Sequence, residues 1–148
     1  MFTQTELNII EQAVEIIESK AKKTSAISSP DLANKLCITK LAHLEHEVFA
    51  ALFLDSQHRL IEFKKMFTGT VDSASVYPRE VVKAALKVNA AAVIFTHNHP
   101  SGVAEPSMAD QHITKRLVNA LELIDVKVLD HIVVGVEGCV SFAQRGLL

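Results

Sequence analysis

The sequence predicts a single α/β domain in which a mixed β-sheet is flanked by helices. The chain has 148 residues, the size of one domain, and 49% of them are hydrophobic, which is enough for a substantial core. Segments with apolar residues at helical spacing alternate with short, continuous apolar runs of strand length. Their order is two helices, two strands, a helix, a strand, a helix and two strands, which indicates an α/β or α+β sheet protein.

Two helices are predicted before the first strand. The first spans about residues 4–22, where Thr3 and Glu6 form a capping box ahead of apolar residues at helical spacing. The second begins at Pro30, because proline is favoured at the first helical position, and it reaches about Leu41. Both helices therefore precede the predicted sheet.

The predicted sheet begins with two strands that form a hairpin. Val48–Leu54 is an almost continuous apolar run of strand length. Arg59–Thr68 follows as its hairpin partner, with apolar residues along the segment. A third helix then begins at Pro78 and ends near Asn89.

A central strand is predicted at Ala90–Thr96, because this continuous apolar run lacks the alternation of a strand with one exposed face. A loop rich in turn-forming residues follows, over 98–106. A fourth helix is predicted over about Ser107–Leu123. Val126–Val134 and Cys139–Phe142 are then the last two strands.

Composition excludes several classes of protein. The formal net charge of −2 argues against a broadly basic surface that would bind nucleic acid phosphates indiscriminately. Cys37 and Cys139 form neither a disulfide framework nor a Cys-x-x-Cys pattern. The N-terminal residues lack the features of a signal peptide, and no apolar run is long enough to cross a bilayer. We therefore expect a cytoplasmic protein without membrane association.

One segment, Thr96–Asp110, carries residues typical of a metal site. His97 and His99 end an extended run, and residues two apart in an extended chain project to the same side. Asp110 lies in the first turn of the next helix, from which its carboxylate can reach the end of the strand. Two imidazoles and one carboxylate leave the fourth position of a tetrahedral zinc ion open for water, which suits hydrolysis.

A purely structural interpretation of the same segment is also open. A chain with 7 histidines can contain a His-x-His pair by chance. Ser107 and Asp110 form an ordinary capping box before an apolar helix, and Asn98 and Pro100 are common turn residues. From residue chemistry alone, the two interpretations have about equal support.

The wider pattern resembles a known family. His97-x-His99-Pro100, followed after six residues by Ser107-x-x-Asp110, resembles the JAMM signature of the JAB/MPN metalloprotease superfamily. The segments HNHPSG and EPS, TVDSASVYPRE upstream, LDHIVVG downstream and SFAQRGLL at the end are similar to the RadC family of bacterial JAB-domain proteins. This resemblance implies a JAB/MPN-type, cytidine-deaminase-like fold. It divides the chain into an N-terminal helical extension, 1–40, and a RadC-like JAB/MPN domain, 41–148.

The resemblance also implies roles for individual residues. In the JAMM pattern the two histidines and the aspartate, here His97, His99 and Asp110, ligate zinc. The serine of the pattern, here Ser107, helps to stabilise an oxyanion, and a hydroxyl at a helix start can do this as well as cap the helix. The family also uses a glutamate on the first strand as general acid and base.

Two glutamates, Glu45 and Glu47, precede the first predicted strand and project the same way. The RadC-like pattern Glu-x-Phe before the strand favours Glu47 as the acid and base. Glu45 stays open as the alternative, and a glutamate at the start of a strand can also be merely solvated. His131 lies within an apolar strand, so we expect a core residue or a hydrogen-bond partner of a ligand.

The resemblance implies a zinc-dependent hydrolase, a peptidase or isopeptidase that cleaves an amide bond in a peptide or protein with Zn²⁺ as cofactor. The alternative is a non-catalytic or DNA-repair-associated accessory protein of the RadC type. Longer RadC-like proteins have a helix-hairpin-helix region, whereas the first 40 residues here contain two predicted helices and no glycine-rich hairpin, so nucleic acid is the weaker partner. A zinc deaminase is rejected, because it needs His-x-Glu and His99 occupies that second position.

Overall fold

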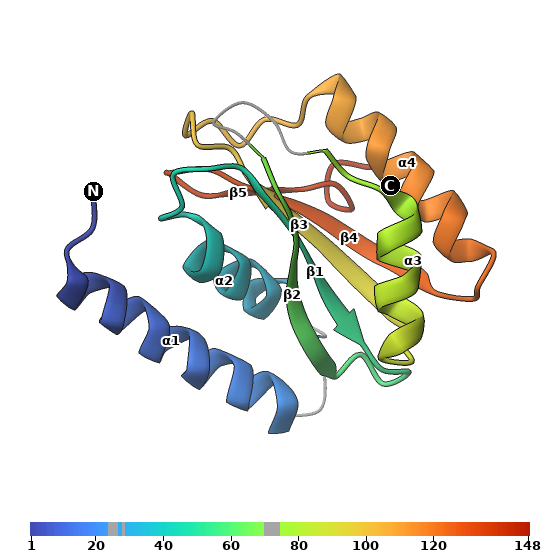
Figure 1. Cartoon of the computed structure of the whole chain (residues 1–148), viewed down its shortest axis with the longest axis horizontal. Coiled ribbons are helices and arrows are strands. Elements are labelled where there is room, and N and C mark those ends of the chain that lie inside the picture. Colours follow the sequence, from blue (N-terminus) through green and yellow to red (C-terminus); the bar gives the residue numbers. More distant parts are fainter. Residues whose placement is uncertain (24–26, 28, 70–74) are drawn as a thin grey trace.

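The computed structural model describes residues 1–23, 27, 29–69 and 75–148, so residues 70–74 of the TVDSASVYPRE segment lie outside the described residues. The helices are α1 (Gln4–Lys23), α2 (Pro30–Leu41), α3 (Pro78–Lys87) and α4 (Met108–Glu122). The strands are β1 (Val48–Leu54), β2 (Leu60–Thr68), β3 (Ala92–Asn98), β4 (Lys127–Val134) and β5 (Cys139–Ser141). They form one mixed sheet in the order β2-β1-β3-β4-β5, in which β3 and β4 are parallel and the other neighbours antiparallel (Figure 1).

The predicted mixed sheet flanked by helices is confirmed, and the predicted central strand is the middle one of the sheet. Its boundaries differ, because β3 spans Ala92–Asn98 instead of Ala90–Thr96. Asn89 adopts a positive φ of 52°, in the left-handed region, so the chain turns there and the strand begins later. At its other end the strand stays extended because His97 and Asn98 continue to pair with β4.

The strands β1 and β3 are buried along their whole length because helices cover both faces of the sheet (Figure 1). Leu52 and Leu54 of β1 pack with residues of α2 on one face. Ala51 and Phe53, which project to the opposite side, pack with residues of α3 and α4 on the other. This double coverage explains why both strands have continuous apolar sequences.

Helices α1 and α2 pack against each other on the same face of the sheet (Figure 1). Lys40 of α2 forms an ion pair with Glu18 of α1, and its ammonium also lies 4.3 Å from the ring centroid of Phe63 in β2. In the part of the chain that the structure describes, no helix combines the length and apolar character needed to span a membrane.

Segments that are distant in the sequence meet at one end of the sheet. Since β1 is antiparallel to β3, the start of β1 lies beside the end of β3, and the end of the parallel strand β4 lies there too. The loops that follow β3 and β4 pack backbone against backbone. A Cβ atom on Gly135 would lie 2.4 Å from the Gly102 oxygen, which is too close for any side chain.

We expect Leu52→Ala to lower the free energy of unfolding by about 2–5 kcal/mol, because it leaves a cavity in the core. Leu52 is 0% exposed and lies in a strand covered on both faces. Urea denaturation followed by circular dichroism measures the change. Leu123→Ala is the matched control, since Leu123 is 86% exposed just after α4, and it should change the free energy by less than about 0.5 kcal/mol. Equal losses in the two variants would contradict the position of β1 inside the sheet.

Candidate metal centre

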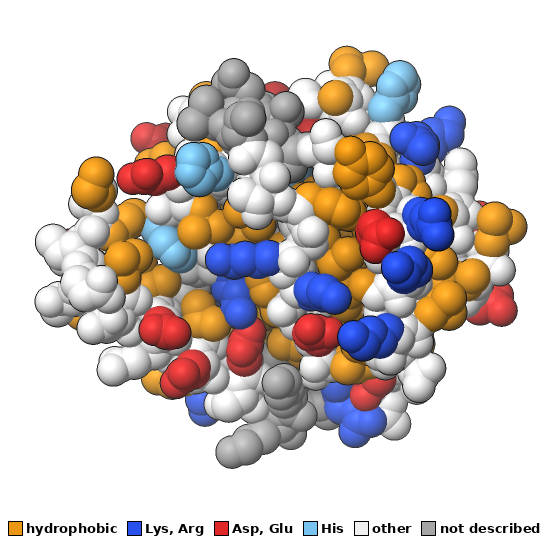
Figure 2. Space-filling model, viewed as in Figure 1, with side chains coloured by type: hydrophobic (Ala, Val, Ile, Leu, Met, Phe, Trp, Pro, Cys, Tyr) orange, Lys and Arg blue, Asp and Glu red, His pale blue; other side chains and the backbone are white. Residues whose placement is uncertain are grey.

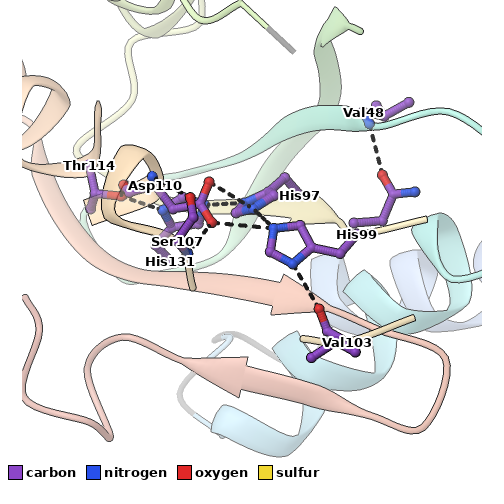
Figure 3. A network of polar contacts seen from close by, with 9 residues as sticks. Val48, His97, His99, Val103, Ser107, Asp110, Thr114 and His131 are labelled. Atoms are coloured by element: carbon purple, nitrogen blue, oxygen red, sulfur yellow. Dashed lines mark hydrogen bonds and ion pairs between the residues drawn. The ribbon is translucent and has the colours of Figure 1, made fainter. Parts of the chain in front are cut away.

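Two imidazoles meet at the end of β3 (Figure 3). His97 is the penultimate residue of β3, and the backbone N–H of His99 donates to the Val134 oxygen of β4 at 2.8 Å. This hydrogen bond prolongs the extended conformation past the strand, so both side chains project to the same side. Their Nε2 atoms lie 2.9 Å apart. The structure thus brings the two imidazoles together as their spacing predicts.

Asp110 reaches the same point from the first turn of α4. Ser107 is the N-cap of this helix, and its Oγ accepts from the Asp110 N–H at 3.0 Å while Asp110 Oδ2 accepts from the Ser107 N–H at 2.8 Å. The same carboxylate places Oδ1 3.3 Å from His97 Nε2 and Oδ2 3.2 Å from His99 Nε2. One side chain therefore closes the helix cap and also lies where a metal ligand is needed.

The charges at this point favour a cation. Burial opposes ionisation of Asp110, but hydrogen bonds with His97 and His99 hold its pKa well below the usual range. The hydrogen bond with Asp110 in turn raises the pKa of His99. His99 Nδ1 lies 2.8 Å from the Val103 backbone oxygen, and because a carbonyl only accepts, Nδ1 carries the proton. In neutral His99 the lone pair therefore lies on Nε2, and a proton added there is donated to Asp110, which is how this contact raises the pKa.

The donor set fits a tetrahedral metal ion. His97, His99 and Asp110 offer one ligand atom each within 4.8 Å of one another, and they are the only such group of three in the described residues. Zinc bonds of about 2.0–2.1 Å in tetrahedral geometry place ligand atoms about 3.3 Å apart. Here the two Nε2 atoms are 2.9 Å apart, and Asp110 approaches His97 through Oδ1 at 3.3 Å and His99 through Oδ2 at 3.2 Å. Three protein ligands leave one position for water or substrate, as in catalytic zinc sites.

His97 rests on buried aromatic and imidazole rings. Its ring stacks on Phe49 of β1 with 6.2 Å between centroids, and its Nδ1 lies 2.8 Å from Nε2 of His131 in β4. His131 is fully buried and stacks on Phe142 at 4.7 Å, and burial lowers its pKa well below the ordinary value. His131 therefore contacts one of the converging residues from behind and is not itself one of them.

Glu47 lies immediately before β1 and beside His99. Phe49 pairs with His97 in the register of β1 and β3, so Glu47, two residues earlier, lies at the end of β1 that adjoins the end of β3. Besides the hydrogen bond with Asp110, the negative charge of Glu47 raises the pKa of His99. Glu45 is exposed in the preceding bend. The geometry favours Glu47 over Glu45 as the carboxylate next to the metal centre.

Asn98 ties the segment that carries Glu47 to β3. It projects away from its two histidine neighbours, its Oδ1 accepts from the Val48 N–H at 2.8 Å, and its side-chain nitrogen donates to the His46 oxygen at 2.9 Å. The sequence indicated Asn98 only as a turn residue. The signal in the sequence was an amide between two histidines at the end of an apolar strand, because an amide buried on the face opposite the histidines needs hydrogen-bond partners.

Asp130 holds the C-terminal turn beside His131. Its Oδ1 accepts from the Ala143 N–H at 3.0 Å, and its Oδ2 accepts from the Ser141 hydroxyl at 2.6 Å. These bonds position Phe142 on His131. The sequence predicts LDHIVVG and the start of SFAQRGLL in two consecutive strands, but not the hydrogen bonds that Asp130 makes between them.

Comparison with known proteins places these residues in a family. A model of the RadC-like JAB domain matches residues 27–147. A UPF0758 protein of Vibrio cholerae is 58% identical over 143 residues, which cover 97% of this chain and 90% of the relative. A UPF0758 protein of Pseudoalteromonas translucida is 54% identical over 140 residues, covering 95% of this chain and 62% of the relative.

A UPF0758 protein of Chromohalobacter salexigens is 58% identical over 130 residues, covering 88% of this chain and 58% of the relative. The chain thus spans most of the Vibrio cholerae relative and about three-fifths of the length of the other two. Since the family model matches most of its residues, the chain belongs to the RadC-like JAB domain family.

Proposed function

We propose that this chain is a zinc-dependent hydrolase of the JAMM metallopeptidase type, which cleaves an amide bond in a peptide or protein. The observation that carries the proposal is the convergence of His97, His99 and Asp110 on one point, with the Glu47 carboxylate near enough to raise the pKa of His99. Membership of the RadC-like JAB domain family supports the proposal. Imidazole nitrogens and a carboxylate oxygen are ligands that zinc takes in catalytic sites.

The proposed chemistry divides the work between zinc and two side chains. Zinc, when bound, supplies Lewis-acid chemistry, because it lowers the pKa of water to about 7 and polarises a carbonyl. Glu47 takes the proton of the attacking water on its carboxylate and later delivers it to the nitrogen of the leaving amine. Ser107 donates from its hydroxyl to the substrate oxygen that becomes negative. In the capping box its Oγ acts as an acceptor, so that bond does not use the hydroxyl proton.

The open side of the metal centre suits a polypeptide substrate. The side chain of His99 is 17% exposed and that of His97 only 2%, so the centre opens toward His99. Val103, whose carbonyl accepts from His99, and Met108, which follows Ser107, are both exposed. Exposed apolar side chains beside a polar site can contact the side chains of a bound peptide. We therefore propose a peptide or protein as the substrate class.

The purified chain is expected to bind one zinc ion, and Asp110→Asn to weaken zinc binding about tenfold or more. The variant loses the charged ligand but keeps an amide oxygen for the helix cap. Metal analysis and competition with a chromogenic chelator measure both effects. Glu6→Gln is the matched control, because Glu6 closes the capping box of α1, with Oε2 2.7 Å from the Thr3 nitrogen, on the other face of the sheet. A wild-type chain that takes up no zinc would contradict the proposal.

Glu47→Gln is expected to lower peptidase activity about 100-fold or more while zinc content stays unchanged, because glutamine cannot carry the proton. Cleavage of a peptide library, with zinc measured on the same samples, provides the test. Glu45→Gln is the matched control and should retain activity, since Glu45 is exposed in the preceding bend. Activity that survives in Glu47→Gln and disappears in Glu45→Gln would reverse the assignment.

A second candidate, binding to DNA in an accessory role, has one observation in its favour. Lys64, Lys83 and Lys87 line a groove between β2 and α3, and Figure 2 shows basic side chains gathered on this side of the molecule. Glu80 lies in the same groove, 3.7 Å from Lys83, and the net charge is −2, so we favour the hydrolase.

A titration with duplex DNA across salt concentrations tests the second candidate. Binding through the groove predicts a complex that weakens as salt rises, because phosphate contacts release counterions. The double variant Lys64→Ala, Lys87→Ala should then bind DNA more weakly than the wild type. If the wild-type chain forms no salt-dependent complex, this candidate is wrong.

A further inference from the structure

We infer that Thr114 and His131 form a buried hydrogen-bonded chain that fixes the tautomer of His97 and thereby sets the metal affinity of the site. The inference rests on the proposed metal centre and gives a positioning role to two residues outside the converging group. Thr114, His131 and His97 are 3%, 0% and 1% exposed, respectively. They connect α4, β4 and β3 behind the converging side chains (Figure 3).

Thr114 determines which atoms donate and which accept in this series of hydrogen bonds. Its Oγ lies 2.6 Å from the backbone oxygen of Asp110, and because a carbonyl oxygen only accepts, the single hydroxyl proton is donated there. The same Oγ lies 2.6 Å from His131 Nδ1. Since its own proton is already used, Thr114 accepts in this second hydrogen bond, and His131 carries a proton on Nδ1.

The position of the proton on His131 in turn determines the position of the proton on His97. Its ring lies among aromatic side chains, with Phe142 stacked at 4.7 Å and Phe95 edge-on at 6.1 Å, an environment that keeps an imidazole neutral. A neutral imidazole has one N–H, so Nε2 of His131 is an acceptor. His97 Nδ1, 2.8 Å away, therefore donates to it. The lone pair of His97 then lies on Nε2, the atom that faces Asp110 and His99.

The hydrogen bonds of Thr114 and His131 also connect two of the converging residues, Asp110 and His97. The series begins at the backbone oxygen of Asp110 and runs through Thr114 and His131 to His97, whose Nε2 lies 3.3 Å from Asp110 Oδ1. It therefore constrains the ring orientation of His97 and the distance between α4 and β3 together. Partners of this kind behind a metal ligand change metal affinity by about 10–100-fold when they are removed.

Packing alone does not explain these side chains. Valine has the shape of threonine and would fill the same space on α4, and burial of a polar group is unfavourable unless it is hydrogen-bonded. The hydroxyl of Thr114 makes two hydrogen bonds, and both ring nitrogens of His131 are engaged. Each buried donor in this series therefore faces an acceptor, an arrangement that side chains serving only to fill space do not require.

Thr114→Val tests the inference, and Thr114→Ser is the matched control. Valine cannot accept the proton of His131 Nδ1, whereas serine keeps the hydroxyl. We expect zinc affinity, measured by competition with a chromogenic chelator, to fall about tenfold or more in Thr114→Val and to stay near the wild-type value in Thr114→Ser. A smaller loss in Thr114→Val, or an equal loss in both variants, would overturn the inference.

The histidine tautomers provide a test that needs no variant to fold. Long-range ¹H–¹⁵N spectra of the metal-free wild-type chain at mildly alkaline pH should show His131 and His97 with the proton on Nδ1. A proton on Nε2 of His131 would overturn the inference even if zinc binds normally. If the expected tautomers are found but the wild-type protein takes up no zinc, the proposed function and the effect on metal affinity both fail, and only the assignment of the tautomers stands.

Discussion

The antiparallel register of β1 against β3 determines where the polar groups of the metal centre lie. Phe49 pairs with His97 and stacks on its ring, so the end of β3 rests on a strand that is buried throughout. Glu47 precedes this end of β1, and its negative charge acts on His99. A slip of one residue would turn these side chains to the other face of the sheet, away from α4 and Asp110. Correct pairing of two apolar strands is therefore a condition for assembling the metal centre.

Asn98 and Asp110 each connect this pairing to a neighbouring element. Asn98 Oδ1 accepts a hydrogen bond from the Val48 N–H at the start of β1, where the polar segment that precedes this strand ends. Asp110 uses one carboxylate both to cap α4 and to contact the imidazoles. A carboxylate at a helix N-terminus is stabilised by the partial positive charge there, so the cap and the demand for an anionic ligand favour the same residue. Local folding of α4 and formation of the centre are consequently coupled.

The sequence predicts those parts of the centre that depend on residues close together in the chain. The spacing of His97 and His99 and the capping box of α4 are of this kind. The chain of Thr114 and His131 joins residues 17 apart, and His131 lies 34 residues from His97, so these contacts exist only once α4 packs on the sheet. The end of β3 was predicted too early for the same reason, because pairing with β4 keeps its polar residues extended.

His97 and His99 are oriented by different neighbours, and they differ in how exposed they are. Buried side chains hold His97 from behind, whereas the Val103 backbone oxygen in the following loop orients the more exposed His99. In the proposed function a substrate approaches from the more exposed side of His99, with Glu47 just before β1 and Ser107 at the start of α4. In the proposed mechanism, proton transfer and oxyanion stabilisation thus come from two different elements on the open side. Glu47 lies outside the buried hydrogen bonds that orient His97, the proposed metal ligand, whereas Ser107 also caps the helix that carries Asp110 and Thr114.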